Sequence, residues 1–162
     1  MIVLNQYRDL WLKEKMDEVI GFYPREFYCF DNFSSFKVEY EGYLYSSVEE
    51  AYQALGFKET APEIYNKIIR CHSAHEAQKI AYANRDKRRK DWSTYKVILM
   101  EKLLRCKLEQ NPYVKKKLIE TKDYMIVEDS PKDDFWGWGE NRDGNNQLGK
   151  LWMKLRDEIN NN

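Results

Sequence analysis

The longest helical pattern in the sequence is the feature that most constrains the fold. Apolar side chains recur in it at steps of three and four residues, namely Trp92, Tyr95, Leu99, Leu103 and Cys106. The pattern stops before Asn111-Pro112, and those two residues are expected to cap the next helix. A long helix with one apolar face needs other elements to cover that face. The spacing therefore predicts a domain in which several helices pack together.

The other predicted elements are shorter. Helices are expected after the start signals Ser47, Pro62, Ser73 and Pro112, and a last helix carries Leu148, Leu151, Trp152, Leu155 and Ile159. Extended structure is expected at "FYCF", residues 27–30, in a hairpin around a Glu41-Gly42 turn, and at "YMIV", residues 124–127. The predicted fold class is α+β and helix-rich, with a small β-hairpin and sheet packed among several helices.

Length and composition indicate one folded domain. The chain has 162 residues, and its 43% of hydrophobic and 15% of aromatic side chains exclude a disordered chain. We expect residues 1–22 to form an N-terminal helical appendage and residues 23–162 to form the domain. The 27 basic and 27 acidic side chains cancel, so net charge favours neither nucleic acid nor membrane as a partner. A charge as early as Arg8 interrupts any signal-peptide pattern, and we expect a cytoplasmic protein.

A metal site is not expected. The best candidate is Cys71-His72-x-x-His75, but Ser73 and Glu76 form a capping box that explains the segment as a helix start. No other set of possible ligands has the spacing of a metal centre. The sequence therefore predicts neither a metal nor a cofactor.

Two adjacent glutamates stand in the first turn of the helix that follows Ser47. If Ser47 is the N-cap, Glu50 occupies the third helical position and can complete a capping box, which makes Glu50 structural. Glu49 then falls at the edge of the apolar stripe, where the helix N-terminus favours its ionised form and partial burial opposes it. The ionised form is expected if the pocket admits water. An ionised, oriented carboxylate suits a reaction that passes through a positively charged sugar carbon. The alternative is that Glu49 is one of the acidic residues common in first turns.

A second candidate site lies between Val127 and Arg156, where tryptophan and glycine alternate. Trp136 and Trp138 offer flat faces for a base or ring, while Gly137 and Gly139 allow a ligand close to the backbone. Asn145 or Asn146 can cap the last helix, whose free N–H groups would bind phosphate together with Lys150. Glu128, Asp133 and Asp134 add negative charge nearby. The alternative is a turn-rich loop whose aromatic side chains belong to the core.

The order of four motifs resembles the NADAR family, named for NAD and ADP-ribose, which includes the YbiA-like N-glycosidases. The motifs are "FSSF" (residues 33–36), "YSSVEEAYQA" (45–54), "VEDSPKDDFWGWG" (127–139) and "NNQLGKLWMKLR" (145–156). The resemblance covers about residues 27–157, and it also includes Trp92 and the "LEQNP" segment. It implies a YbiA-like fold and hydrolysis of a bond between nitrogen and the anomeric carbon of a ribose phosphate.

The resemblance also implies roles for single residues. Glu49 and Asp133 would be catalytic, Trp136 would stack on the base or ring, and Lys150 would bind phosphate. The other expected ligand-binding residues are Asn32, Phe33, Ser34, Tyr52, Gln53, Trp92, Gly137, Gly139 and Asn146. The sequence departs from the family pattern at Gly56, where relatives often carry a lysine, and at Ala81-Tyr82, where relatives tend to show Gly-Arg. Lys58 is the nearest substitute for the missing lysine, but it is expected to be aimed elsewhere.

Three functional hypotheses follow from the resemblance. The first is removal of ADP-ribose from guanine in DNA or in guanosine nucleotides, as an antitoxin-like partner of a toxin ADP-ribosyltransferase. The basic run 85–90 would then contact the nucleic acid through Arg85, Arg88 and Arg89, although a solvated loop explains that run as well. The second is an N-glycosidase acting on ribosylaminopyrimidine phosphates of riboflavin biosynthesis. The third is a non-catalytic module that binds ADP-ribose or NAD.

Overall fold

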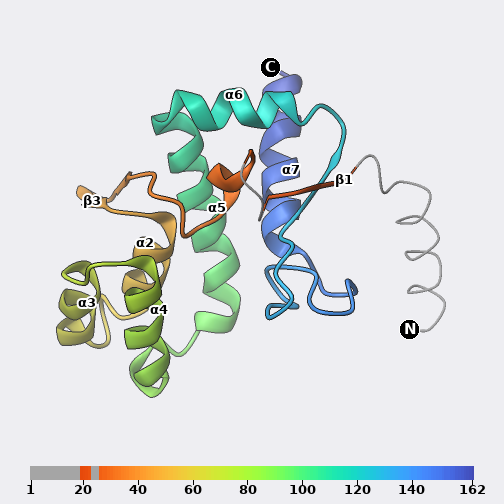
Figure 1. Cartoon of the computed structure of the whole chain (residues 1–162). Helices are drawn as coiled ribbons and strands as arrows, with labels where there is room; N and C mark the ends of the chain where they lie inside the picture. Colours follow the sequence, from red (N-terminus) through yellow and green to blue (C-terminus); the bar gives the residue numbers. More distant parts are fainter. Residues whose placement is uncertain (1–18, 23–25) are drawn as a thin grey trace. The chain divides into compact units, whose positions relative to one another are not determined.

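The computed structural model describes residues 19–22 and 26–162 (Figure 1). The chain divides into two compact units. We call residues 32–115 the central unit, and the described residues before 32 together with residues 116–162 the terminal unit. Each unit combines helices with a two-stranded sheet, so the predicted helix-rich α+β class is confirmed. Within the described residues, no helix is both long and apolar enough to cross a membrane.

The central unit begins with the predicted hairpin. Strands β2 (Val38–Tyr40) and β3 (Tyr43–Tyr45) pair antiparallel, with Val38 opposite Tyr45. The two turn residues have positive φ, 48° at Glu41 and 82° at Gly42, which is the backbone that a two-residue hairpin turn requires. The paired strands bury Val38 and Tyr45 on one face. The alternating pattern in the sequence thus specified both the turn and the register.

Helix α2 (Val48–Leu55) lies at the centre of this unit. It packs against α3 (Pro62–Ile69), α4 (Ala74–Ala83) and α5 (Trp92–Gln110), and all of its residues are buried (Figure 1). The start signals at Pro62 and Ser73 are confirmed, as is the end of the long helix before Asn111-Pro112. Because helices pack on several sides of α2, Glu50 is buried as well, with 4% of its surface exposed.

The terminal unit joins the two ends of the described chain. Strand β1 (Val19–Gly21) runs parallel to β4 (Met125–Val127), with Ile20 opposite Ile126. Most of the predicted appendage, residues 1–18, lies outside the described residues, and a helix reaching residue 22 is wrong because residues 19–21 form β1. The "FYCF" segment is also not extended, since Tyr28–Phe30 form the short 3-10 helix η2. The strand predicted at residues 124–127 is confirmed as β4.

Helix α7 (Gln147–Asn160) packs on β4 and supplies much of the core of the terminal unit. Its fully buried Trp152 contacts the Phe30 ring and donates from Nε1 to the Phe30 carbonyl oxygen at 3.0 Å. Arg156, one turn further on, donates to Thr121 Oγ1 at 3.0 Å. Helix α6 (Pro112–Glu120) leads from the central unit into the terminal unit. These contacts hold the buried face of α7 at two points one turn apart.

Candidate active site

The start of α2 is organised by hydrogen bonds around Glu50. Ser47 is the N-cap, and its Oγ accepts from the Glu50 backbone N–H at 3.1 Å. The Glu50 carboxylate reaches back to Ser46, accepting from its N–H at 2.5 Å and from its Oγ at 2.6 Å. The carboxylate therefore bonds one residue earlier than the expected partner Ser47. Its structural role in fixing the first turn is as predicted.

Glu49, the neighbour of Glu50, is buried, with 4% of its surface exposed. Its backbone N–H donates to the Asn32 carbonyl oxygen at 3.0 Å, and its Oε1 accepts from Gln53 Nε2 at 2.8 Å. Glu49 and Gln53 stand four residues apart, so they face the same side of α2. A buried carboxylate is tolerated only when hydrogen bonds replace its hydration. Gln53, itself 2% exposed, supplies such a bond.

Gln53 also connects Glu49 to a cation. Arg88 donates from Nη2 to Gln53 Oε1 at 2.8 Å. Because a guanidinium can only donate, this contact fixes the amide with its oxygen toward Arg88 and its nitrogen toward Glu49. Burial lowers the pKa of Arg88, but the ordinary value is so high that the guanidinium stays protonated. Gln53 thus joins Arg88 to Glu49, and its amide replaces part of the hydration that the buried Glu49 carboxylate has lost.

Aromatic rings lie close to the Arg88 guanidinium. The Arg88 guanidinium lies 4.7 Å from the centre of the Trp92 ring and 5.3 Å from that of Phe57. The Tyr52 and Trp92 rings are 4.9 Å apart. Such faces stabilise a cation and also offer flat surfaces to a base or sugar. The central unit therefore brings the predicted site residues Glu49, Tyr52, Gln53 and Trp92 together with Arg88.

The segment before the hairpin adds polar groups to this region. Asn32 is 7% exposed, its Nδ2 lies 3.5 Å from Met100 Sδ, and its Oδ1 is buried without a hydrogen-bond donor among the described residues. Ser34 accepts from Nζ of the fully buried Lys107 at 2.8 Å. Phe33 lies with its ring 4.7 Å from that of His75. Asn32 contacts Glu49 directly, because its carbonyl oxygen accepts the Glu49 backbone N–H.

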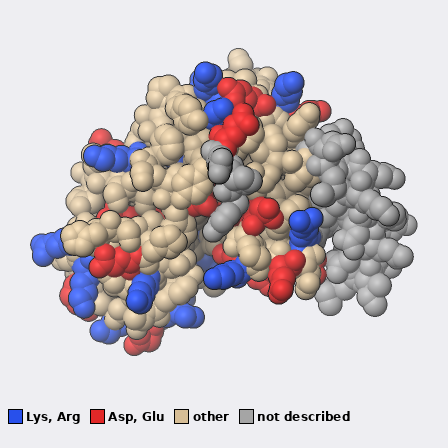
Figure 2. Space-filling view, in the orientation of Figure 1, with Lys and Arg blue, Asp and Glu red and all other residues tan. Residues whose placement is uncertain are grey.

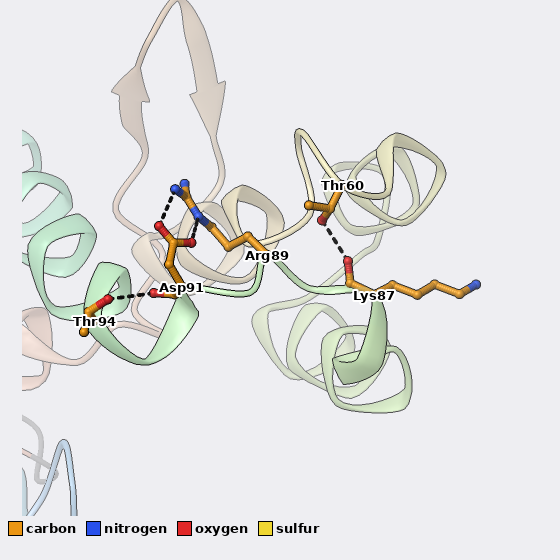
Figure 3. Close-up of polar contacts among 5 residues, drawn as sticks. All are labelled: Thr60, Lys87, Arg89, Asp91 and Thr94. Carbon is orange, nitrogen blue, oxygen red and sulfur yellow. Dashed lines mark hydrogen bonds and ion pairs between the residues drawn. The ribbon is translucent and has the colours of Figure 1, made fainter.

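The basic run 85–90 is held in place by contacts at its end and middle (Figure 3). Thr60 Oγ1 donates to the Lys87 carbonyl oxygen at 2.7 Å, and the Arg89 backbone N–H donates to the Gly56 carbonyl oxygen at 2.9 Å. The Arg89 guanidinium binds both oxygens of Asp91, at 2.6 and 2.9 Å. The Lys87 side chain extends away from this pair (Figure 3). The segment is thus ordered by its own contacts, and Arg88 is held between two anchored residues.

The three arginines proposed for nucleic-acid contact have different surroundings. Arg88 faces Gln53, while Arg89 pairs with Asp91 and lies 3.5 Å from the centre of the Tyr95 ring. Arg85 stacks on Tyr82 at 4.9 Å and donates to the Tyr82 carbonyl oxygen. Figure 2 shows basic and acidic side chains interspersed on the visible face. A contact of these residues with nucleic acid stays a prediction, and Arg88 has a second possible use within the Glu49 region.

The tryptophan and glycine loop belongs to the terminal unit. Asp133 Oδ1 accepts from the backbone N–H groups of Phe135 at 2.9 Å and Trp136 at 2.7 Å, so one carboxylate oxygen holds the turn that carries Trp136. Trp138 is 5% exposed and donates from Nε1 to Asp129 at 2.8 Å, which makes it a core residue. A Cβ at Gly137 would stand 2.7 Å from the Glu128 carbonyl oxygen. Close packing of the loop backbone therefore explains that glycine.

Asn146 joins β4 to α7. It stands at the N-cap position with a left-handed φ of 48°, but its side chain does not cap the helix. Its Oδ1 accepts from the Glu128 N–H at 2.9 Å, and its Nδ2 donates to the Ile126 carbonyl oxygen at 2.9 Å. Both ends of the amide are therefore used within the protein rather than open to a ligand. Lys150, one turn into α7, is exposed.

The structure sorts the predicted residues between the two units. The central unit holds Asn32, Phe33, Ser34, Glu49, Tyr52, Gln53 and Trp92, and the terminal unit holds Asp133, Trp136, Gly137, Gly139, Asn146 and Lys150. In the central unit, the polar groups suited to chemistry meet around Glu49. There an ionisable carboxylate, an amide and a guanidinium are aligned beside aromatic rings.

Related proteins match most of this chain. The NADAR domain family matches residues 18–160. An N-glycosidase of Nostoc punctiforme is 34% identical over 136 residues, which cover 82% of this chain and 86% of that protein. The chloroplastic riboflavin biosynthesis protein PYRR of maize is 32% identical over 156 residues, which cover 87% of this chain but 25% of that protein.

A solved structure shows the same similarity in three dimensions. The N-glycosidase YbiA of Escherichia coli strain K12 is 30% identical over 145 residues, which cover 88% of this chain and 89% of that protein. The NMR structure of the E. coli protein YbiA matches with a TM-score of 0.79, covering 88% of this chain and 85% of that chain. The expected YbiA-like fold is thereby confirmed.

Proposed function

This chain belongs to the NADAR domain family, and it is a hydrolase of the N-glycosidase type. From this premise we propose that it hydrolyses the bond between a nitrogen and the anomeric carbon of a ribose phosphate, using Glu49. The observation that supports this proposal is the buried Glu49 carboxylate, held at 2.8 Å by Gln53, which is held in turn by Arg88 at 2.8 Å. A carboxylate fixed in this way is suited to stabilise an oxocarbenium-like transition state or to orient the attacking water.

Other residues would assist this reaction. The Tyr52 and Trp92 rings offer flat faces to the base or the sugar. Asp133 would hold ribose hydroxyls or share the acid–base work through Oδ2, because its Oδ1 already accepts two backbone hydrogen bonds. Lys150 would bind the phosphate, and Trp136 would stack on the base or ring of the substrate. The roles of these terminal-unit residues follow from the motifs they occupy.

We propose ADP-ribosylated guanine, in DNA or in guanosine nucleotides, as the substrate to test first. Gly56 stands where relatives often carry a lysine, and a chain lacking that lysine is expected to differ in substrate from those relatives. The exposed Lys87 and Lys90 of the basic run are available to a nucleic-acid strand. An antitoxin role beside a toxin ADP-ribosyltransferase would follow from this activity.

The second candidate substrate is a ribosylaminopyrimidine phosphate. The similarity to proteins named for riboflavin biosynthesis favours it, although this chain spans only 25% of the maize protein. The reaction would use the same carboxylate, because the bond that breaks again joins nitrogen to an anomeric carbon. The two candidates differ in the size of the leaving group and in whether one or two phosphates are attached to the ribose.

The test is turnover followed by mass spectrometry. Wild-type protein, Glu49→Gln and Glu50→Gln are each given a guanine-ADP-ribosylated oligonucleotide and, separately, a ribosylaminopyrimidine phosphate. Glu49→Gln removes the charge but keeps an acceptor for Gln53, so we expect turnover to be lost with the fold intact. Glu50→Gln makes the same change one residue away, at a group bonded only within the first turn, and should stay active. Absence of turnover by the wild type on both substrates would refute the proposal and favour a binding module.

A further inference from the structure

We infer that Arg88 is the residue of the Glu49 site that binds the phosphate of the substrate, and that residue 56 is glycine because the Arg88 side chain needs its space. This inference rests on the proposed function and specifies which side chain binds the phosphate of the substrate. It gives Arg88 a place inside the site, whereas the sequence suggested a contact with nucleic acid. Three observations support it: the surroundings of Gly56, the Arg88 donors that have no acceptor among the described residues, and the single Gln53 amide between Arg88 and Glu49.

Gly56 has no conformational reason to be glycine. Its φ of −66° and ψ of −18° are ordinary helical values, which any residue adopts. The space beside it is taken, however, since a Cβ at this position would stand 3.1 Å from Arg88 Cγ and 3.2 Å from Trp92 Cζ3. The aliphatic part of Arg88 therefore crosses the place where a side chain at position 56 would begin. A side chain there would require Arg88 and Trp92 to shift by a few tenths of an ångström.

Most hydrogen-bond donors of Arg88 have no acceptor among the described residues. It makes one hydrogen bond to the described residues, from Nη2 to Gln53, and forms no ion pair with them. Its Nε is buried and has no acceptor among the described residues. Leaving a half-buried charge without a counter-charge is costly, and stacking on Trp92 and Phe57 compensates for it only partly. A cation held in this state is suited to receive an anion.

Two other basic side chains near this end of α2, Lys58 and Arg89, already form ion pairs with carboxylates. Lys58 lies 3.4 Å from Glu41 in an exposed ion pair on the hairpin turn, as its expected direction away from the site suggested. Arg89 is paired with Asp91. Arg88 is thus the basic residue after α2 whose charge is directed back toward Glu49 and not toward a carboxylate of its own.

The chemistry of the expected ligand follows from the spacing. One glutamine amide separates the Arg88 guanidinium from the Glu49 carboxylate. In a ribose 5-phosphate, the anomeric carbon and the carbon that bears the phosphate arm both adjoin the ring oxygen, so the two groups are close enough to contact Glu49 and Arg88 together. Guanidinium groups bind phosphate oxygens through paired hydrogen bonds. The same requirement is met by the phosphate nearest the ribose in ADP-ribose and by the single phosphate of a ribosylaminopyrimidine.

The direct test is binding, which does not require turnover. Ribose 5-phosphate, ADP-ribose and unphosphorylated ribose are titrated by calorimetry into wild-type protein, Arg88→Ala, Arg88→Lys and Lys87→Ala. A charged hydrogen bond to phosphate is worth about 10- to 100-fold in affinity, so Arg88→Ala should weaken both phosphorylated ligands by that factor and leave ribose unchanged. Arg88→Lys should recover part of the loss. Lys87→Ala removes the same charge from an exposed neighbour and should change affinity by less than about 3-fold.

A variant at position 56 keeps the test informative if Arg88→Ala does not fold. Gly56→Ala leaves Arg88 present but crowds its stem, and it should weaken the phosphorylated ligands in the same direction by a smaller factor. Equal affinities of wild type, Arg88→Lys and Gly56→Ala for the phosphorylated ligands would overturn the inference. So would a loss in Arg88→Ala that extends equally to ribose.

Turnover separates this inference from the proposed function. If neither N-glycoside is hydrolysed but Arg88→Ala still binds ribose 5-phosphate more weakly than the wild type does, the proposed function fails and the phosphate site is supported. If the oligonucleotide is hydrolysed and Arg88→Ala and Lys87→Ala raise its KM equally, with a weaker salt dependence, Arg88 contacts the nucleic-acid backbone and the phosphate site is refuted.

Discussion

Replacing Asn146 should reveal how the loop of the terminal unit is tied to its helix. The Asn146 amide bridges the Glu128 N–H and the Ile126 carbonyl oxygen, both at 2.9 Å, and so links β4 to the first turn of α7. Asn146→Ala removes both hydrogen bonds without adding atoms. Asn146→Gly removes the same bonds but suits the left-handed φ of 48° better than alanine does. The two variants therefore separate hydrogen bonding from backbone strain.

The expected loss can be estimated from the groups left behind. Ile126 is fully buried and Glu128 is 7% exposed, so water cannot readily replace the missing amide. A buried backbone group without a partner costs about 1–3 kcal/mol, which gives roughly 2–6 kcal/mol for the pair. Alanine in left-handed backbone adds about 1 kcal/mol that glycine avoids. Asn146→Ala should thus lower the free energy of unfolding by about 3–7 kcal/mol, and Asn146→Gly by about 1 kcal/mol less.

Urea denaturation followed by tryptophan fluorescence measures these changes, because Trp138 and Trp152 are buried in the same unit. The neighbouring Asn145 is exposed and provides the matched control, since Asn145→Ala should shift the free energy of unfolding by no more than about 0.5 kcal/mol. A loss below about 1 kcal/mol in Asn146→Ala would refute the reasoning. Wild-type stability in Asn146→Gly would show that backbone conformation alone matters at this position.

Three further predictions address the proposed catalytic groups and the pH dependence of stability. Glu49→Gln should reduce kcat by about 10²- to 10⁴-fold in the turnover assay while thermal unfolding shows no loss of stability, and a comparable kcat would remove Glu49 from the chemistry. Asp133→Asn keeps the acceptor for the Trp136 turn and should lower turnover without lowering stability, whereas Asp133→Ala should lower both; equal urea midpoints for the two would contradict the turn-holding role. Burial and the 2.9 Å hydrogen bond with Tyr65 raise the pKa of Tyr45 above the ordinary value of 10.0, so the unfolded chain releases this proton first and stability should fall as pH rises above about 10. Tyr45→Phe should flatten that alkaline decline in denaturation series, and an unchanged slope would assign it to other groups.

Signals that act over a few residues were readable from the sequence. Ser47 and Glu50 fix the start of α2 through contacts spanning three or four residues, and Gly42 supplies the positive φ of the hairpin turn. The bond between Glu49 and Gln53 has the same origin, since side chains four residues apart face each other on a helix. Both residues were expected in the site. Their direct contact needed no more than helical spacing to be foreseen.

Features that depend on distant partners were not readable. The segment Val19–Gly21 becomes a strand because β4 lies beside it, with Val19 paired to Met125, and three residues alone cannot indicate this. The apolar run "FYCF" is equally short, and such runs do not distinguish a strand from one helical turn. The full burial of α2 is set by the helices that pack around it. In each case tertiary packing decided between local conformations of similar energy.

Arg88 shows why a charge run alone is ambiguous. In the sequence it stands among basic neighbours, and nothing there distinguishes it from Lys87 or Arg89. In the structure it crosses Gly56, lies on Trp92 and reaches Gln53, 35 residues earlier in the chain. The one local sign was Gly56 itself, a glycine at the end of a helix with no turn that needs it. Its meaning depends on which side chain occupies the space beside it.

Gly56 thus determines the position of Arg88 in two ways. Its carbonyl oxygen accepts the Arg89 backbone N–H at 2.9 Å, which holds the backbone beside Arg88, and its missing side chain leaves room for the Arg88 stem. A lysine at position 56, as relatives often carry, would place its Cβ 3.1 Å from Arg88 Cγ and 3.2 Å from Trp92 Cζ3, so these neighbours would have to shift by a few tenths of an ångström. Glycine avoids that shift and leaves the Arg88 stem beside the Trp92 ring.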